Sequence, residues 1–100
     1  MPDRSDIIER LYTVEDPELG MNLVDLGLIY GVAVTGGQIR VDATLTYPGC
    51  PFGSIIIEKI KHALADFGDV TVRIIWEPPW NQQMMAEETL EELRFAGRIR

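Results

Sequence analysis

The feature that most constrains this fold is the pair Gly36-Gly37, which separates two runs of alternating apolar and polar residues. Two-residue loops between antiparallel strands need positive φ angles, which glycine adopts freely. The pattern therefore predicts strands over 28–35 and 38–46 that pair as a hairpin. In the register that such a loop fixes, Tyr30 lies opposite Ala43 and every pair on one face is apolar. The hairpin should therefore bury a single face.

Three helices are predicted around this hairpin, because apolar residues recur there every three or four positions. A third strand is predicted where apolar and polar residues alternate again. Because a strand–helix–strand connection is right-handed, the second and third strands should be parallel within a mixed sheet. In chain order the further elements are a helix capped by Asp3 or Ser5 and ended by Asp16-Pro17, a helix from Pro51 to about Phe67, a strand from Val70 to Trp76 and a helix from about Gln83 to Phe95.

The order helix–strand–strand–helix–strand–helix predicts an α+β fold, a two-layer domain with a small mixed three-stranded sheet covered by helices. The 100 residues suffice for one hydrophobic core, so we expect a single domain over residues 1–100. A net charge of -7 excludes the basic surfaces that bind nucleic acid or anionic membranes. No apolar run approaches the roughly 20 residues of a spanning helix. A lone cysteine and a polar N-terminus indicate a cytoplasmic protein.

That cysteine, Cys50, lies where the turn after the hairpin is predicted to lead into a helix. Pro51 suits the first helical position, so Cys50 would be the N-cap residue. The positive end of the helix dipole would then favour the thiolate, the form that attacks substrates and binds metals. The alternative is an inert cysteine, because free cysteines are among the most buried residues. The surrounding Pro and Gly residues favour the functional interpretation.

Three residues are predicted to lie beside Cys50. Thr44 and Thr46 point to the same side of their strand, and the hairpin register pairs Gly27 with Thr46, which brings Asp25 to the same end of the sheet. Alternatively, the threonines are ordinary strand residues and Asp25 caps a turn. The prediction is a reactive site made of Cys50, Asp25, Thr44 and Thr46, in which Cys50 is the candidate ligand of a metal or cluster.

A second candidate surface surrounds Trp76 and Trp80, which flank two prolines and precede Met84. Tryptophan and methionine are enriched at protein interfaces, so these side chains are candidate partner-binding residues. The alternative is that Trp76 closes the core and Trp80 packs on the last helix.

The inventory of metal-binding side chains limits what one chain can hold. There is one cysteine and one histidine, His62, which excludes a standard zinc site. Iron–sulfur clusters need about four thiolate-type ligands, so one monomer cannot complete a cluster site. A homodimer, or this chain together with a client protein, could supply enough ligands for a cluster.

Four motifs occur in order along the chain: Asp16-Pro17-Glu18-Leu19-Gly20, Val24-Asp25-Leu26-Gly27-Leu28-Ile29-Tyr30, Thr44-Leu45-Thr46 with Pro48-Gly49-Cys50-Pro51, and Trp76-Glu77-Pro78-Pro79-Trp80 with Met84. With these motifs the sequence resembles the PaaD-like and SufT-like metal–sulfur cluster biosynthesis family, in the iron–sulfur cluster assembly domain superfamily. The resemblance covers nearly the whole chain and implies a small α+β domain. It also implies a role in cytosolic iron–sulfur protein maturation.

Within this resemblance, Cys50 is the reactive or ligating residue, and Asp25, Thr44 and Thr46 match motif positions around it. Asp16 and Glu18 match the family's Asp-Pro-Glu signature and join the candidate partner-binding residues. PaaD itself carries an additional cysteine-rich C-terminal segment. This chain has no cysteine after Cys50, so a stand-alone assembly factor is expected.

The main hypothesis is an accessory factor in iron–sulfur cluster assembly or insertion, in which Cys50 is a transient ligand of iron or of a cluster. Its partners would be iron–sulfur client or assembly proteins, and the monomer would hold no tightly bound cofactor. A Cys-dependent enzyme for a small molecule, with Asp25 as general base, is one alternative. The other is a non-catalytic adaptor, or a subunit of a PaaD-like oxygenase maturation system.

Overall fold

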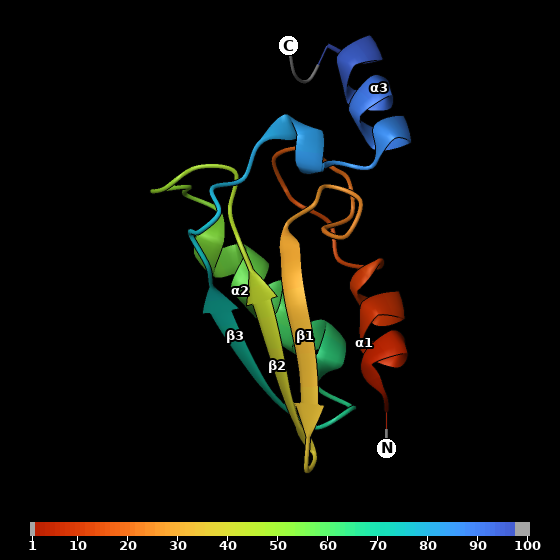
Figure 1. Ribbon diagram of the computed structural model, residues 1–100, viewed down its shortest axis with the longest axis vertical. Helices are drawn as coiled ribbons and strands as arrows, with labels where there is room; N and C mark the ends of the chain where they lie inside the picture. Colours follow the sequence, from red (N-terminus) through yellow and green to blue (C-terminus); the bar gives the residue numbers. More distant parts are fainter. Residues whose placement is uncertain (1, 98–100) are drawn as a thin grey trace.

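The computed structural model describes residues 2–97, so the outermost residues of the predicted domain, 1 and 98–100, lie outside the described part. Strands β1 (Ile29–Thr35), β2 (Gln38–Ala43) and β3 (Asp69–Ile74) form one sheet in the order β1-β2-β3 (Figure 1). β1 and β2 are antiparallel, and β2 and β3 are parallel. The predicted mixed three-stranded sheet is confirmed.

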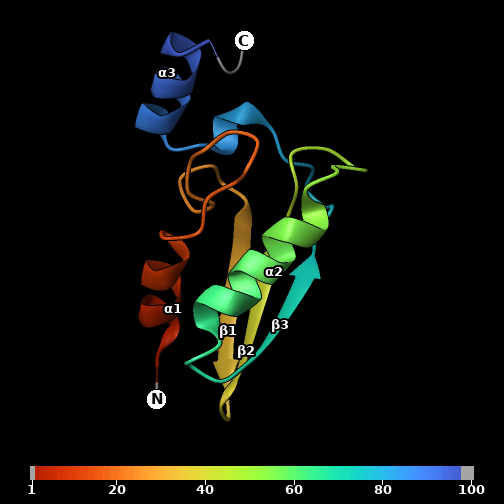
Figure 2. The same cartoon turned by 180° about the vertical axis from the view of Figure 1, so that it is seen from behind.

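Two helices, α1 (Arg4–Leu11) and α2 (Gly53–Leu64), cover one face of this sheet (Figure 2). The short 3₁₀ helix η1 (Gln82–Met84) and helix α3 (Glu87–Phe95) lie beyond the end of the sheet where β1 begins (Figure 1). The predicted α+β class is therefore confirmed. Among residues 2–97 no helix has the length and apolar character needed to cross a membrane. The fully buried side chains between sheet and helices include Ile7, Leu11, Ile39, Val41, Ile56, Ile60 and Leu64.

Helix α1 starts where it was predicted to start and ends earlier. The carboxylate of Asp3 accepts the N–H of Asp6 at 2.9 Å, and the carboxylate of Asp6 accepts the N–H of Asp3 at 3.0 Å. This reciprocal capping box satisfies two N–H groups that a helix start otherwise leaves unpaired. The helix ends at Leu11 rather than at Asp16-Pro17, because the N–H groups that follow bond three residues back and tighten the last turn.

Arg10 joins α1 to the end of α2. Its guanidinium donates to the carbonyl of Ala63 at 2.8 Å and to the carboxylate of Asp66 at 2.8 Å. The same group lies 4.3 Å from the centre of the Phe67 ring. One side chain therefore connects the first helix to residues more than 50 positions away.

The predicted hairpin register is correct near the turn and wrong at the far end. Gly31 lies opposite Asp42 as predicted, but Ile29, and not Tyr30, lies opposite Ala43. Tyr30 is thus an extra residue, a β-bulge, and all pairs beyond it shift by one. Its hydroxyl donates to the carbonyl of Pro78 at 2.7 Å, so the side chain leaves the predicted buried face.

The segment after β3 packs against the loop before β1. The indole N–H of Trp80 donates to the carbonyl of Leu26 at 2.8 Å, and the N–H of Ala86 donates to the carbonyl of Asp25 at 2.7 Å. Gly27 has a φ of +75°, and a side chain there would collide with the backbone carbonyl of Met84. These contacts explain why the last helix begins at Glu87 and not near Gln83: residues 80–86 follow the loop instead.

Candidate functional site

Cys50 lies in a loop that projects from the end of the sheet between β2 and α2 (Figure 1). Its N–H donates to the carbonyl of Tyr47 at 3.3 Å, and its carbonyl accepts the N–H of Gly53 at 3.2 Å. Two consecutive turns therefore separate the strand from the helix, whose N-cap residue is Phe52. The prediction that Cys50 caps α2 is wrong, and with it the argument that the helix dipole favours its thiolate.

The Cys50 side chain is half-buried and packs at the margin of the hydrophobic core. The residues that surround it in the loop, Tyr47, Pro48, Gly49 and Pro51, are exposed. Cys50 as a residue is therefore partly open to solvent at a projecting point of the molecule, where another protein can approach the loop.

The Tyr47 hydroxyl lies near both this thiol and the Glu18 carboxylate. Partial desolvation raises the pKa of the Tyr47 hydroxyl above its ordinary 10.0, and interactions with the Glu18 carboxylate and the Cys50 thiol raise it further. The phenol therefore stays protonated at neutral pH and can donate a hydrogen bond to a carboxylate or to sulfur. Tyr47 was not among the predicted site residues, although its position three residues before Cys50 was a usable signal.

Asp16 shapes the loop that carries Glu18. It is only 3% exposed, and its carboxylate accepts the N–H groups of Glu18 at 2.7 Å and Leu19 at 3.0 Å. Its carboxylate is therefore committed to the backbone, whereas the side chain of Glu18 is exposed. Of the two acidic residues in the Asp-Pro-Glu motif, Glu18 is the one that another molecule can reach.

The two threonines of the candidate site differ in their surroundings. Thr44 directly follows β2, is 1% exposed, and its N–H donates to the carbonyl of Leu28 at 2.8 Å. Its hydroxyl has no hydrogen-bond partner among residues 2–97. Thr46 is half-buried and begins the turn that leads to Cys50. An unsatisfied buried hydroxyl is costly and rare in native proteins, which makes Thr44 the more unusual of the two.

Asp25 is held by contacts outside the Cys50 loop. The pairing continues beyond the bulge at Tyr30 with a shift of one residue, so Asp25 stays at this end of the sheet and its place beside Cys50 remains a prediction. The Asp25 carboxylate accepts the side-chain amide of Asn22 at 2.8 Å, and its carbonyl accepts Ala86. The contacts of Asp25 thus belong to the junction with the C-terminal segment.

The candidate partner residues near the C-terminus are also separated by the fold. Trp80 and Met84 are half-buried, and the Met84 sulfur accepts the hydroxyl of Tyr30 at 3.5 Å. Trp76 is 45% exposed and does not close the core. Of these three side chains, Trp76 is the most accessible to a partner.

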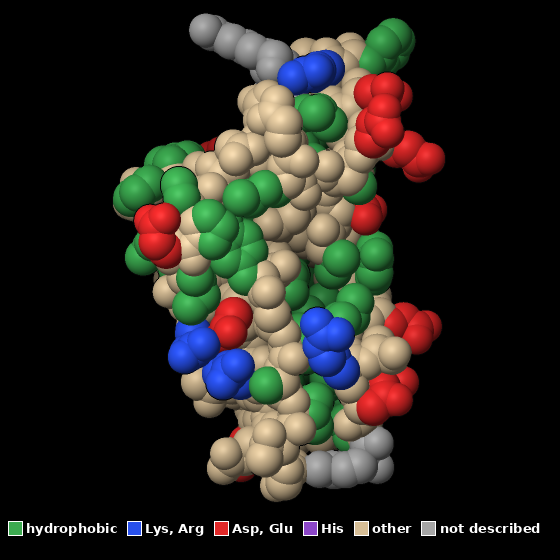
Figure 3. Space-filling model, in the orientation of Figure 1, with side chains coloured by type: hydrophobic (Ala, Val, Ile, Leu, Met, Phe, Trp, Pro, Cys, Tyr) green, Lys and Arg blue, Asp and Glu red, His purple; other side chains and the backbone are tan. Residues whose placement is uncertain are grey.

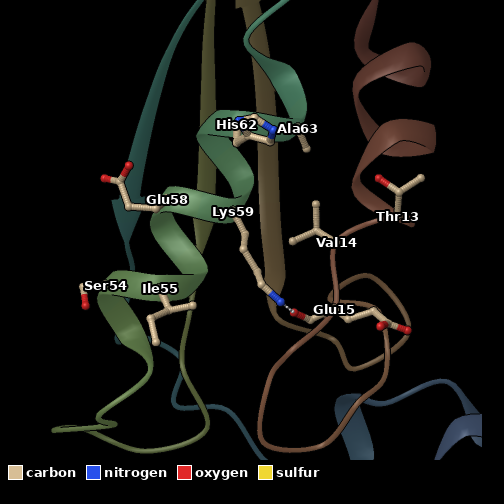
Figure 4. Close-up of a pocket in the computed structure, with 9 residues that line it drawn as sticks. All are labelled: Thr13, Val14, Glu15, Ser54, Ile55, Glu58, Lys59, His62 and Ala63. Atoms are coloured by element: carbon tan, nitrogen blue, oxygen red, sulfur yellow. Dashed lines mark hydrogen bonds between the residues drawn. The ribbon is translucent and has the colours of Figure 1, made fainter.

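A groove of about 670 Å³ lies between the end of α1 and α2, and it extends to the start of α2 near the Cys50 loop (Figure 4). Ile55, which is 45% exposed, lies at this end, and Lys59 crosses the groove to donate to the carbonyl of Glu15 at 3.2 Å. The sequence analysis missed this groove. The run of three isoleucines at 55–57 was the signal, because three consecutive helical positions cannot all face one core.

The face of the sheet opposite the helices carries a cluster of charges (Figure 3). Arg73 donates to both carboxylate oxygens of Asp42, at 2.8 Å and 3.0 Å, and Arg40 lies 3.3 Å from the same carboxylate. The hydrogen bond from Arg73 holds the pKa of Asp42 below its ordinary value. This face therefore has a fixed array of alternating charges.

The described residues contain no group of three or more His, Cys, Asp and Glu side chains that could hold a metal ion. The ligand-type groups near the projecting loop are the Cys50 thiol and the Glu18 carboxylate. Further ligands for iron or a cluster would have to come from another molecule.

Comparison with known proteins gives one consistent result. The profile of the iron–sulfur cluster assembly protein family matches residues 4–74. An Fe-S protein maturation auxiliary factor of Porphyromonas gingivalis is 43% identical over 94 residues, which cover 90% of both chains. The Fe-S protein maturation auxiliary factor SufT of Staphylococcus aureus is 48% identical over 77 residues, 73% of this chain and 88% of that one. A domain of unknown function, DUF59, from Bacillus anthracis has a similar structure, with a TM-score of 0.83 and 30% identity over 96% of this chain and 92% of that one.

Proposed function

The chain belongs to the iron–sulfur cluster assembly protein family, and we propose that it is an accessory factor that acts on client proteins through Cys50. In this proposal the thiol is a transient ligand of the iron or the cluster being delivered, which is cargo rather than a resident cofactor. The partners are cytoplasmic iron–sulfur assembly proteins and the clients that receive the cluster.

The observation that carries this proposal is the placement of the chain's only thiol. Cys50 is partly exposed on a projecting loop, with the Tyr47 hydroxyl close to it and the Glu18 carboxylate close to Tyr47. A thiolate binds iron strongly, and a carboxylate can occupy a second position. With too few ligands in one chain, the bound iron or cluster would remain incompletely coordinated, which favours its transfer to a client that supplies more thiolates.

Within the site we assign different tasks to the neighbouring residues. Glu18 contacts the cargo or the client, since its side chain is exposed. Asp16 holds the loop that presents Glu18, through its two backbone hydrogen bonds. Tyr47 donates a hydrogen bond to the sulfur or the carboxylate and thereby orients the two groups.

The test is client maturation in cells that carry Cys50→Ser in place of the natural chain. Serine keeps the size of the side chain and removes the soft sulfur ligand, so the cluster content of client enzymes should fall at least about tenfold if Cys50 delivers the cluster. Cluster content is read from purified clients by iron and sulfide analysis and by visible absorbance. Unchanged cluster content would rule out the thiol as the delivering group.

A relocated thiol provides the matched control. Ser54 is exposed on the first turn of α2, four residues after Cys50. The double variant Cys50→Ser/Ser54→Cys therefore has one thiol at the same end of the molecule but outside the turn. It should remain inactive if the position beside Glu18 and Tyr47 matters. Full activity would mean that any nearby thiol suffices.

The adaptor function is the second candidate, and the exposure of Trp76 is the observation that favours it. An adaptor needs a surface and no thiol. Trp76→Ala should then abolish client maturation while Cys50→Ser preserves it, the reverse of the result expected above.

A further inference from the structure

Strand β3 is an open edge of the sheet. It pairs with β2 on one side, and no other strand among residues 2–97 lies along its other side (Figures 1 and 2). The N–H of Ile75 donates to the carbonyl of Ala43 on the β2 side. Because backbone groups alternate in direction along a strand, Val70 and Val72 point their N–H and C=O groups outward.

This edge lacks the usual protection against pairing. Native edge strands carry prolines, bulges or inward-pointing charges that prevent another strand from adding. Within β3 there is no proline, and the register with β2 is continuous. The charged side chains of Asp69 and Arg73 lie with Thr71 on the solvent-exposed face of the sheet, so no charge points into the core. Val70 and Val72 are only half-buried on the other face, so a further strand would cover them.

We propose that the partner of this edge is a second copy of the chain. The two β3 strands would pair antiparallel about a two-fold axis at Thr71, which joins two three-stranded sheets into one continuous sheet. The N–H and C=O groups of Val70 that point away from β2 would bond to Val72 of the second copy. By symmetry, those of Val72 would bond to Val70 of the second copy. Thr71 would lie opposite Thr71 of the second copy.

The sequence of β3 selects this register. Only shifts by two residues keep outward-pointing backbone groups opposite each other. With the axis at Thr71, Asp69 lies directly opposite Arg73 of the second copy, and the pair occurs twice. A shift by two residues in either direction places Arg73 or Asp69 opposite Thr71 and loses both charge pairs. Opposite charges that face each other across strands are stabilising.

The charges already present on the open face extend this match. Arg73 donates to Asp42 on the neighbouring strand at 2.8 Å and 3.0 Å. In the paired sheet the side of the Arg73 guanidinium that does not contact Asp42 would face Asp69 of the second copy. Each arginine would then lie between two carboxylates, so charges of opposite sign alternate across the interface.

Such a dimer would keep the two Cys50 thiols apart. The Cys50 loop lies at the end of the sheet where β2 and β3 finish (Figure 1). In an antiparallel dimer these ends of the two copies point in opposite directions. The C-terminal ends of the two β3 strands would be about 20 Å apart at a rise of about 3.3 Å per residue, and the loops lie beyond them. The two thiols therefore cannot share one cluster, and each would face its own client.

The first test is disulfide cross-linking in the Cys50→Ser background. Thr71→Cys places a thiol on the two-fold axis, where Cα atoms of a non-hydrogen-bonded pair are about 4.5 Å apart, within disulfide range. Thr35→Cys, an equally exposed strand position beside the hairpin turn, is the control. Under mild oxidation the Thr71→Cys variant should form covalent dimer at least about tenfold faster. Equal rates would overturn the inference.

The second test uses charge reversal and sedimentation to measure mass. Asp69→Lys alone places Lys opposite Arg73, and Arg73→Glu alone places Glu opposite Asp69, so each variant should be monomeric. Mixed together they restore two opposite-charge pairs and should form a heterodimer. Glu91→Lys on α3 makes the same change in net charge as Asp69→Lys and should leave the dimer intact.

Asp69→Lys leaves the Asp42–Arg73 pair in place, so it remains informative even if Arg73→Glu weakens the fold. A natural chain that stays monomeric at millimolar concentration would refute the interface. That result would leave the proposed role of Cys50 untouched, because client maturation is measured separately.

Discussion

Replacing Thr44 by valine should stabilise this protein. The Thr44 side chain is 1% exposed and its hydroxyl has no partner among the described residues. A buried hydroxyl without a hydrogen bond costs about 1–3 kcal/mol, because its bonds to water are lost and not replaced. Valine has nearly the same shape, and its additional methyl group contributes about 0.8 kcal/mol of apolar burial. We therefore expect the free energy of unfolding to rise by at least about 1 kcal/mol.

Urea unfolding measures this change through the midpoint at unchanged slope. For a domain of this size, 1 kcal/mol corresponds to a rise in Tm of about 4–8 °C. Thr46→Val is the matched control, since Thr46 is half-buried and its substitution should change stability by less than about 0.5 kcal/mol. If Thr44→Val is no more stable than the natural chain, the hydroxyl is hydrogen-bonded in solution and the reasoning fails.

Thr44→Val also tests whether the unsatisfied hydroxyl in the core has a functional role. Costly polar groups are kept in native proteins when they serve function. If Thr44 acts in the site near Cys50, Thr44→Val should stabilise the fold and at the same time lower the cluster content of client enzymes. A stabilised variant with full client maturation would assign Thr44 no part in the site.

Three further predictions follow from individual contacts. Asp16→Ala should lower the free energy of unfolding in urea by about 1.5–3 kcal/mol, because two backbone N–H groups lose a charged acceptor. Gly27→Ala should cost at least about 2 kcal/mol, from positive-φ strain and collision with the Met84 carbonyl, and should speed hydrogen exchange of the Ala86 amide. The pKa of Asp42 is lowered in the folded state, so its carboxylate contributes fully to the free energy of unfolding above its ordinary value of 3.8, and this contribution is lost as the pH falls further. In Asp42→Asn the free energy of unfolding should therefore depend less on pH below about pH 4.

Each of these has a simple control. Glu15→Ala removes an exposed neighbour of Asp16 and should be nearly neutral, so an equal loss at both positions would contradict the role of the Asp16 carboxylate. Gly36→Ala combines a φ of +56° with open space and should show strain alone. Glu9→Gln removes an exposed carboxylate on α1 and should keep the acid-dependent slope that Asp42→Asn loses.

The sequence was sufficient to predict elements that depend on neighbouring residues. The hairpin followed from Gly36-Gly37, which adopt φ angles of +56° and +83°. The parallel pairing of β2 and β3 followed from the handedness of strand–helix–strand connections. Both features depend on the local geometry of the chain, and this geometry can be predicted from a single sequence.

The errors came from contacts between distant segments. Tyr30 has the apolar character of a buried strand residue, but its hydroxyl finds the Pro78 carbonyl 48 positions away and the strand bulges. Cys50-Pro51 has the pattern of a helix start, yet Leu45 packs closely against the backbone at Gly53, and the helix begins there. The same bulge shifts the pairing before Ile29 by one residue, which the alternation of residues 28–35 did not reveal.

The link made by Arg10 has a kinetic consequence. The hairpin closes through a two-residue turn and can form early, whereas Arg10 meets Ala63 and Asp66 only when α1 packs against the end of α2. Contacts of such large sequence separation are expensive to close, and we expect this one to form after the folding transition state. Interactions that are absent from the transition state leave the folding rate nearly unchanged and slow unfolding. Arg10 thus contributes chiefly to the lifetime of the folded chain, and little to the speed with which the chain folds.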